Sequence, residues 1–253
     1  MIKRTFCIAP SIGKKKEMCI WESGIRNWEE FLDAEEVCTV PVYRKGDCDR
    51  AISKAADLLK NRDSVGLGKI TPKSEKWRMF GEFGDEAAYL DIETDGLSRD
   101  SLVTAVTVHR KNRTVTLVHG RELNSRNLSD ALNGSTMLVT FNGSCFDIPI
   151  LKNSFPSLDF EMPHLDLRFA ARRVGFSGGL GRLETELGIE RAEEIEGVDG
   201  FEAVRLWKRW EMYNDADALD KLVEYNRADT VNLERIAEIV YPKLVRDYAG
   251  FIW

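Results

Sequence analysis

Two carboxylates two residues apart, Asp91 and Glu93, follow an apolar start in the stretch 87–97. Side chains along a β-strand alternate between the two faces of a sheet, so these two acids point the same way. Their mutual repulsion is relieved when a divalent cation, which prefers carboxylate oxygens, lies between them. Because Asp and Glu supply 42 of the 253 residues, an exposed strand end in an acidic protein is the alternative interpretation. Further acids elsewhere in the chain must decide between the two.

Asp147 is a third candidate, and it follows a stretch, 135–141, that has the composition of a buried strand. An Asn-Gly turn at Asn142 and the aromatic residue Phe146 separate that stretch from the acid, which begins a predicted helix. Functional side chains often lie where a chain leaves a sheet. An Asp that only stabilises the N-terminus of its helix is the alternative interpretation.

Tyr225 and Asp229 lie four residues apart in a predicted helix that covers residues 219–244. Residues at this spacing lie one turn apart on the same face of a helix. The apolar residues of this helix place Asp229 on or beside its buried side, where a carboxylate needs a partner. Pairing with Arg227 or Arg235 would satisfy that need without any catalytic role.

The elements expected to position these acids form an α/β domain. Strands are predicted at residues 87–92, 102–109, 114–118, 135–141 and 162–167, and helices at 127–132 (with an Asn cap), 178–188 and 201–210. The second and third strands alternate apolar and polar residues around a turn, as a hairpin does. Three antiparallel strands followed by a helix and another strand are typical of the start of a ribonuclease H-like fold, a mixed sheet flanked by helices.

Residues 1–80 are predicted to form an accessory region of mixed α and β structure before a catalytic domain at 81–253. Strands are expected at residues 4–9 and 37–42, a helix at 49–60 and a polar linker at 61–86. The linker is indicated by its glycines, its Thr-Pro step and its charged residues.

Gly13 is followed by three consecutive lysines, Lys14, Lys15 and Lys16, at the start of a predicted helix. A second glycine, Gly24, ends that helix, and an amphipathic helix follows. The pattern resembles a helix-hairpin-helix motif, in which backbone N–H groups near the first glycine hold a nucleic-acid phosphate. An ordinary helical hairpin with solvated lysines fits the same residues.

The composition is that of a globular protein, with 43% hydrophobic and 31% charged residues and a net charge of −6. This charge counts against a purely electrostatic nucleic-acid binder, but not against a nuclease whose carboxylates are offset by bound metal. No apolar run is long enough to span a bilayer and no signal peptide is visible, so we expect a cytoplasmic protein with no membrane partner. The five cysteines form no Cys-x-x-Cys pair, which favours free thiols over zinc ligands or disulfides.

Taken together, the acidic motifs resemble those of the DEDD superfamily of 3′–5′ exonucleases, in its tyrosine subclass, and are most similar to the YprB-like branch. The similarity covers about residues 85–245 and rests on the runs Tyr-Leu-Asp-Ile-Glu-Thr-Asp-Gly-Leu, Phe-Asn-Gly-Ser-Cys-Phe-Asp-Ile-Pro and Glu-Tyr-Asn-Arg-Ala-Asp, in that order. This resemblance implies a ribonuclease H-like fold and hydrolysis with two divalent metal ions, Mg²⁺ or Mn²⁺.

The resemblance also implies a role for each candidate residue. Asp91, Glu93 and Asp229 are expected to hold the first of the two metal ions. The second ion is expected to be bridged by Asp91 and reached by Asp147, mostly through water. Tyr225 is expected to orient the attacking water.

By the same resemblance, Leu97 and Phe146 are expected to pack against terminal bases. Asn142 and the backbone around Thr94 are expected to hold the 3′ end. The implied substrates are single-stranded 3′ ends of DNA or RNA, released as 5′-mononucleotides, with DNA slightly favoured by the N-terminal motif. Asp166 is a candidate extra acid, for which a structural strand-end role is the alternative.

Two other functions remain open. A non-catalytic nucleic-acid-binding or partner-docking module has no need of four mutually repelling carboxylates. A ribonuclease H-type endonuclease does not normally carry a Tyr one helical turn before its last acid. An attached ATPase is not indicated, because the sequence contains no Gly-x-x-x-x-Gly-Lys-Ser/Thr run.

Overall fold

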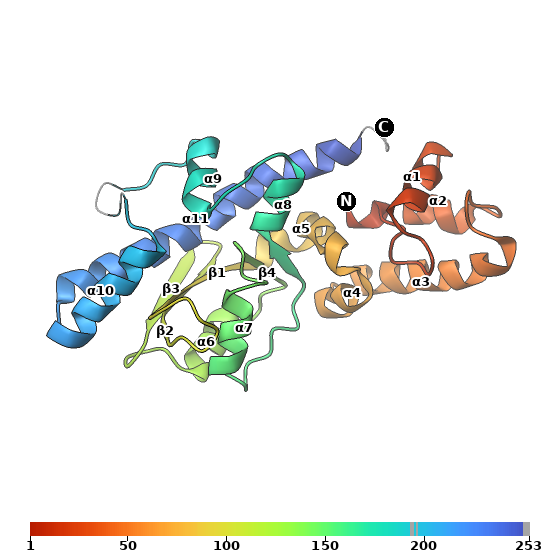
Figure 1. Cartoon of the computed structure of the whole chain (residues 1–253). Coiled ribbons are helices and arrows are strands. Elements are labelled where there is room, and N and C mark those ends of the chain that lie inside the picture. The colour runs from red at the N-terminus through yellow and green to blue at the C-terminus, as the bar shows by residue number, and fades with distance from the viewer. Residues whose placement is uncertain (193–194, 196, 250–253) are drawn as a thin grey trace.

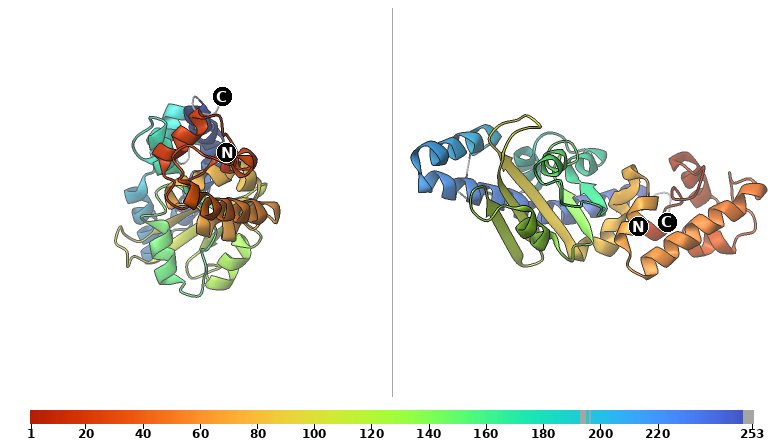
Figure 2. Two further views of the ribbon diagram at one scale, coloured as in Figure 1. Left: turned by 90° about the vertical axis from the view of Figure 1, so that its right-hand side faces the viewer. Right: turned by 90° about the horizontal axis from the view of Figure 1, so that it is seen from below.

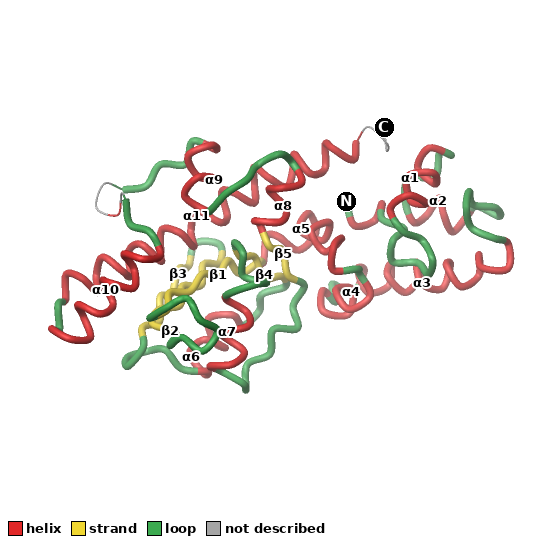
Figure 3. Tube along the Cα trace, viewed as in Figure 1, coloured by secondary structure: helices red, strands yellow, loops and turns green. Residues whose placement is uncertain are grey.

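A five-stranded mixed sheet lies at the centre of the computed structural model, which describes residues 1–192, 195 and 197–249 (Figure 1). Its strands, in the spatial order β3-β2-β1-β4-β5, are β1 (Ala87–Thr94), β2 (Val103–Arg110), β3 (Arg113–Val118), β4 (Met137–Thr140) and β5 (His164–Asp166). The first three strands pair antiparallel, whereas β1 with β4 and β4 with β5 pair parallel. Figure 3 shows these strands, in yellow, among the helices of the chain. This mixed sheet confirms the predicted ribonuclease H-like class of fold.

Helices cover both faces of the sheet and extend beyond it (Figure 1, Figure 2). They are α6 (Ser125–Leu132), α7 (Asp147–Ser154), α8 (Leu167–Arg173), α9 (Leu180–Leu187), α10 (Gly200–Tyr213) and α11 (Ala216–Ala249). The cap of α6 is Asn124, three residues before the expected start, and Gly188 ends α9 in the left-handed conformation with a φ of 69°. Of the helices described, none is long and apolar enough to cross a membrane.

Alternate residues of β1 pack against helices on opposite faces of the sheet. Leu90 belongs to a buried cluster with Leu128 of α6, whereas Tyr89 belongs to the cluster that contains the apolar face of α11. Because strand side chains alternate, Asp91 and Glu93 share the face of Tyr89 and are directed toward α11. The pairing of β1 with β2 changes register directly after Glu93, where Thr94 pairs with Val103.

The first 86 residues, which the structure describes in full, are helical. Their elements are η1 (Ile2–Arg4), α1 (Lys14–Glu22), α2 (Trp28–Asp33), α3 (Val42–Lys60), α4 (Ser64–Ile70), η2 (Lys73–Met79), α5 (Phe80–Phe83) and η3 (Gly84–Glu86), where η marks a 3-10 helix. The strands predicted at 4–9 and 37–42 were wrong, because the only β pairing in residues 1–86 is an isolated bridge between Val37 and Val40. The linker predicted at 61–86 was also wrong, since that segment forms four helices.

A buried ion-pair network explains the differences at residues 4–9 and 61–86. The Glu17 carboxylate on α1 accepts from Thr5 Oγ1 at 2.6 Å and from the Phe6 backbone N–H at 2.7 Å. The same carboxylate pairs with Arg78 on η2 at 2.7 Å, and Arg78 also pairs with Glu75 at 2.8 Å. Glu17 thus satisfies backbone groups that a strand partner would otherwise bind, and Arg78 fixes the supposed linker to α1.

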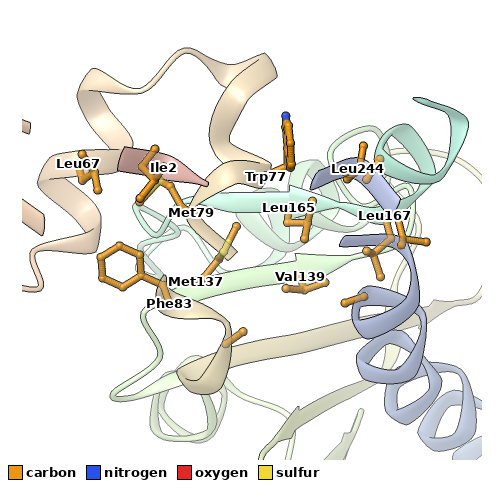
Figure 4. Packing of buried hydrophobic residues seen from close by; sticks show 14 of the residues in the cluster. Ile2, Leu67, Trp77, Met79, Phe83, Met137, Val139, Leu165, Leu167 and Leu244 are labelled. Atoms are coloured by element: carbon orange, nitrogen blue, oxygen red, sulfur yellow. The ribbon is translucent and has the colours of Figure 1, made fainter. Parts of the chain in front are cut away.

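The N-terminal helices share their hydrophobic core with the sheet. Ile2 and Leu67 belong to one buried cluster with Met137 and Val139 of β4 and Leu244 of α11 (Figure 4). Burial of apolar surface in this continuous cluster holds the accessory helices against the end of the sheet.

Candidate active site

Asp91 on β1 is joined to helix α11 by a chain of hydrogen bonds. The side-chain amide of Asn226 donates to Asp91 Oδ2 at 2.8 Å, and Asn226 Oδ1 accepts from Thr107 Oγ1 on β2 at 2.5 Å. Asn226 and Thr107 are fully buried, so their polar groups depend on these partners. The chain of bonds fixes the rotation of α11 about its axis and brings Asp229, three residues later, to the same side of the helix.

The turn after β4 delivers Asp147 to the same edge of the sheet. Asn142 lies in the left-handed region with a φ of 65°, which Asn tolerates better than most residues. The Gly143 N–H donates to Thr140 Oγ1 at 3.1 Å, and a Cβ on Gly143 would lie 2.3 Å from that oxygen. Only glycine fits this close approach, after which Asp147 begins α7 as a buried residue.

Asp166, at the end of β5, anchors this turn. Its carboxylate accepts from the backbone N–H groups of Asn142 at 2.8 Å and Ser144 at 3.0 Å, and from Ser144 Oγ at 2.5 Å. It also caps α8 by accepting from the Arg168 N–H at 3.1 Å. These bonds support the structural interpretation of Asp166 over that of an extra catalytic acid.

Four buried carboxylates at this edge all have a raised pKa, and Asp147 and Asp229 contribute to the shifts of Asp91 and Glu93. Burial raises the pKa of Asp91 well above its ordinary value, and repulsion by three neighbouring carboxylates raises it further. The pKa of Glu93 is raised by burial and then by Asp229 and Asp147. Burial likewise raises the pKa of Asp147 and that of Asp229 to about 7, although Arg191 opposes the shift of Asp229. The structure therefore brings the four predicted acids into one electrostatic cluster.

Arg191, after α9, supplies the positive charge that faces this cluster. Its guanidinium lies 2.6 Å from both Asp229 and Glu184, and its centre lies 5.4 Å from the centroid of the Tyr225 ring. Glu184 is held in turn by the Asn232 amide at 2.8 Å. The partner of Asp229 is thus neither of the two arginines of α11 that the sequence suggested. Sequence reasoning missed Arg191 because no regular spacing connects it to the acidic motifs.

The donor set suits a divalent metal, although it is not arranged as a completed site. Among the residues that the structure describes, no three His, Cys, Asp or Glu side chains are placed to hold a metal ion. The buried Oδ1 of Asp229 makes no hydrogen bond despite its ion pair with Arg191. The cluster offers only carboxylate oxygens, the ligands that Mg²⁺ and Mn²⁺ prefer. In charge and in donor type, the four acids therefore fit such an ion.

The predicted substrate-binding residues differ in their exposure. Leu97 follows β1 and is 64% exposed, whereas Phe146 is half-buried against the cluster beneath α7. The Thr94 hydroxyl is buried and donates to the Gly96 carbonyl at 2.5 Å. Asn142 Oδ1 accepts from an Arg168 guanidinium nitrogen at 2.8 Å. Leu97 is therefore accessible, and the roles of all four residues in substrate binding stay predictions.

The three N-terminal lysines are not brought to the carboxylate cluster. Lys14, Lys15 and Lys16 begin α1, which lies among the accessory helices at the other end of the molecule from α10 (Figure 1). Lys14 pairs with Glu75 at 3.2 Å, which engages one of the three charges within the protein. A phosphate-binding role for these lysines stays a prediction.

A family model described as the RNase_H superfamily matches residues 88–241. The match covers more than half of the chain and includes all four candidate carboxylates. The chain therefore belongs to the RNase H superfamily, whose members typically hydrolyse phosphodiester bonds and generally use divalent metal ions. None of the curated proteins compared with the chain matches it.

Proposed function

We propose that the protein is a metal-dependent 3′–5′ exonuclease that acts on single-stranded nucleic-acid 3′ ends and releases 5′-mononucleotides. The observation that carries this proposal is the meeting of the carboxylates of β1 with Tyr225 and Asp229 of α11. Asp229 and Asp147 both raise the pKa of Glu93, and the same two acids act on Asp91. A Tyr one turn before the last acid distinguishes this arrangement from the endonuclease alternative.

Each acid has a proposed place in metal binding. Asp91, Glu93 and Asp229 would hold one ion, and Asp91 with Asp147 would hold the second. When bound, two such ions activate a water and neutralise the charge that develops on the leaving 3′ oxygen. Asn226 would keep one oxygen of Asp91 in position, because the side-chain amide N–H of Asn226 donates to that oxygen.

Tyr225 is proposed to position the attacking water. Burial raises the pKa of its hydroxyl above the ordinary value, and Asp229, Glu93 and Asp91 raise it further. The phenol therefore keeps its proton at neutral pH and can hold a water by a hydrogen bond. Its contact with Asp229 helps to lower the pKa of that acid, which places the hydroxyl beside a proposed metal ligand.

The substrate end of the site is proposed from the same elements. Leu97 and Phe146 would contact the terminal bases, and Asn142 with the backbone at Thr94 would hold the 3′ terminus. The accessory region at residues 1–80 is proposed to bind nucleic acid as well, which would favour DNA slightly over RNA. A cytoplasmic location is proposed with this function.

The test uses single-stranded DNA and RNA of matched sequence, each labelled separately at its 5′ or 3′ end. Incubation with Mg²⁺, with Mn²⁺ and with a chelator should give a metal-dependent ladder of 5′-labelled products that shortens from the 3′ end. The 3′ label should be released at once as a mononucleotide. Internal fragments would indicate an endonuclease, and binding without cleavage would indicate a docking module.

A further inference from the structure

A cavity of about 880 Å³ opens between the segment 68–77 and the elements β5 and α8. One wall consists of η2 and the residues before it, and the opposite wall of residues from His164 to Arg173. Helix η2 contacts β5 directly, so the two walls hold a fixed relation to each other. Ser144 and Cys145, in the turn before Asp147, also line this cavity. We call it the η2–α8 groove.

The groove is lined by cations that lack acidic partners. Lys73 and Lys76 on η2 make no ion pair with any described residue, and Arg173 on α8 donates only to the Ser74 carbonyl, at 2.7 Å. A fourth cation, Lys69, pairs with an exposed glutamate outside the groove. Each of these three cations can therefore bind an anion without breaking an ion pair within the protein.

The negative charge of the groove is already engaged. Among its described lining residues, Asp166 is the only acid, and its carboxylate accepts from Asn142, Ser144 and Arg168. Lys76 is half-buried, and burial together with repulsion from Lys73 lowers its pKa. Two cations crowded without a counterion favour an external anion at this place.

An exposed aromatic side chain lies beside these cations. Phe169 on α8 is 44% exposed and lines the groove, although a phenylalanine on a helix that packs against a sheet is normally covered. Positive charge next to an exposed aromatic ring is the usual combination for single-stranded nucleic acid, whose unpaired bases can stack on the ring. A base in a duplex has both faces covered and does not offer that contact.

The groove borders the turn that leads to Asp147 of the candidate active site. Ser144 lines the groove and lies three residues before Asp147, and Asp166 holds the turn that contains it. Arg168, directly before Phe169, donates to Asn142 Oδ1 at 2.8 Å. The turn after β4 therefore lines the groove and leads directly into Asp147 of the carboxylate cluster.

We propose that the η2–α8 groove binds the sugar-phosphate backbone of single-stranded nucleic acid behind the 3′-terminal nucleotides, with phosphates on Lys73, Lys76 and Arg173 and a base on Phe169. The inference rests on the proposed exonuclease function for the direction of the strand, but not for the binding itself. It assigns a role to the segment 68–77, which the sequence had indicated to be a linker.

The test measures binding to a fluorescein-labelled single strand of about 12 nucleotides, a length within the range that one such site covers. Fluorescence anisotropy in a chelator, over a series of salt concentrations, keeps hydrolysis out of the measurement. Because a single-stranded phosphate contact contributes about 0.7 to the salt slope, the variant Lys73→Ala/Lys76→Ala should lower that slope by about 1.4. Its affinity at low salt should fall with it.

The matched control is Arg126→Ala/Lys208→Ala, which removes two exposed charges from α6 and α10, outside both the groove and the accessory region. This control should keep the wild-type slope. Phe169→Ala should weaken binding by about fivefold or more, and Phe169→Tyr should restore it, because tyrosine keeps the stacking ring.

Equal salt slopes for the Lys73/Lys76 variant and its control would overturn the proposal that the groove binds the strand. So would a Phe169→Ala variant that binds like the wild type. Binding that depends on the groove residues, without any 3′ hydrolysis, would support the groove as a binding site and contradict only the proposed exonuclease function. Hydrolysis from the 3′ end together with binding that does not change in the Lys73, Lys76 and Phe169 variants would support the exonuclease and contradict the groove proposal.

Discussion

The acids of the candidate site could be found from their spacing, but their partners could not. The period of two on β1 and of four on α11 placed Asp91 with Glu93, and Tyr225 with Asp229, on shared faces. Asn226 carries no such signal, since a polar residue in a long helix is ordinary. Arg191 reaches Asp229 only through the folded path of the chain after α9. Local periodicity predicts which face a side chain occupies, and tertiary contacts decide what meets it.

Tyr225→Phe tests the role of the phenol at this scale. The substitution removes one hydroxyl and leaves the ring that packs beside Arg191. Loss of a group that positions the attacking water should lower kcat by about 100-fold, with little change in KM. Steady-state hydrolysis of a 5′-labelled strand, measured over a series of strand concentrations, gives kcat and KM separately.

Tyr213→Phe is the matched control, because Tyr213 lies 73% exposed at the end of α10. It should hydrolyse the strand at the wild-type rate. If Tyr225→Phe and Tyr213→Phe gave the same kcat, Tyr225 would be a packing residue only.

Among the elements, η2 departs most from expectation. The sequence predicted a linker at residues 61–86 from its glycines and charged residues. Nothing in the sequence shows that Arg78 is buried against Glu17, 61 residues away. A buried arginine is retained only when carboxylates satisfy it, and here two of them do. The glycines, the Thr-Pro step and the charged residues favour a loop when the segment is considered alone. The long-range ion pair with Glu17 outweighs these local preferences.

The junction of β4 and β5 makes a pH-dependent contribution to stability. Burial lowers the pKa of His164, Asp166 opposes the shift and Lys73 and Lys76 add to it, and the net pKa is about 4. The neutral ring shares a hydrogen bond of 2.8 Å with Thr140 Oγ1 on β4. Because the folded-state pKa lies below the unfolded value of about 6.5, the unfolded state binds the proton first as the pH falls.

The free energy of unfolding should therefore lose this contribution between about pH 6.5 and pH 4. Relative to His164→Gln, which does not titrate, the wild type should lose about 3 kcal/mol across that window, from 1.36 kcal/mol per pKa unit. Urea unfolding of both proteins at several pH values measures the difference. Parallel curves would show that the ring is protonated as readily in the folded state as in the unfolded one.

At the scale of the whole molecule, the sequence predicted the sheet better than the accessory region. Alternating and continuous apolar runs identified all five strands within a few residues, because each pattern reflects burial on a regular element. The N-terminal region has no such regularity, and its helices are held by a core that they share with β4 and α11. The division of the chain at residue 80 stays a prediction, and the shared core means that both parts contribute to one folded unit.

The most direct test of the central claim compares Asp91→Asn with Asp85→Asn in the end-labelled 3′-degradation assay. Both variants lose one negative charge, but Asp85 is exposed on η3 and Asp91 faces the carboxylate cluster. The oxygen of an Asn at position 91 can still accept from Asn226, so the fold should persist, as circular dichroism would confirm. We predict no metal-dependent product from Asp91→Asn and a wild-type ladder from Asp85→Asn. A ladder that persists in folded Asp91→Asn would contradict the assignment of the metal site.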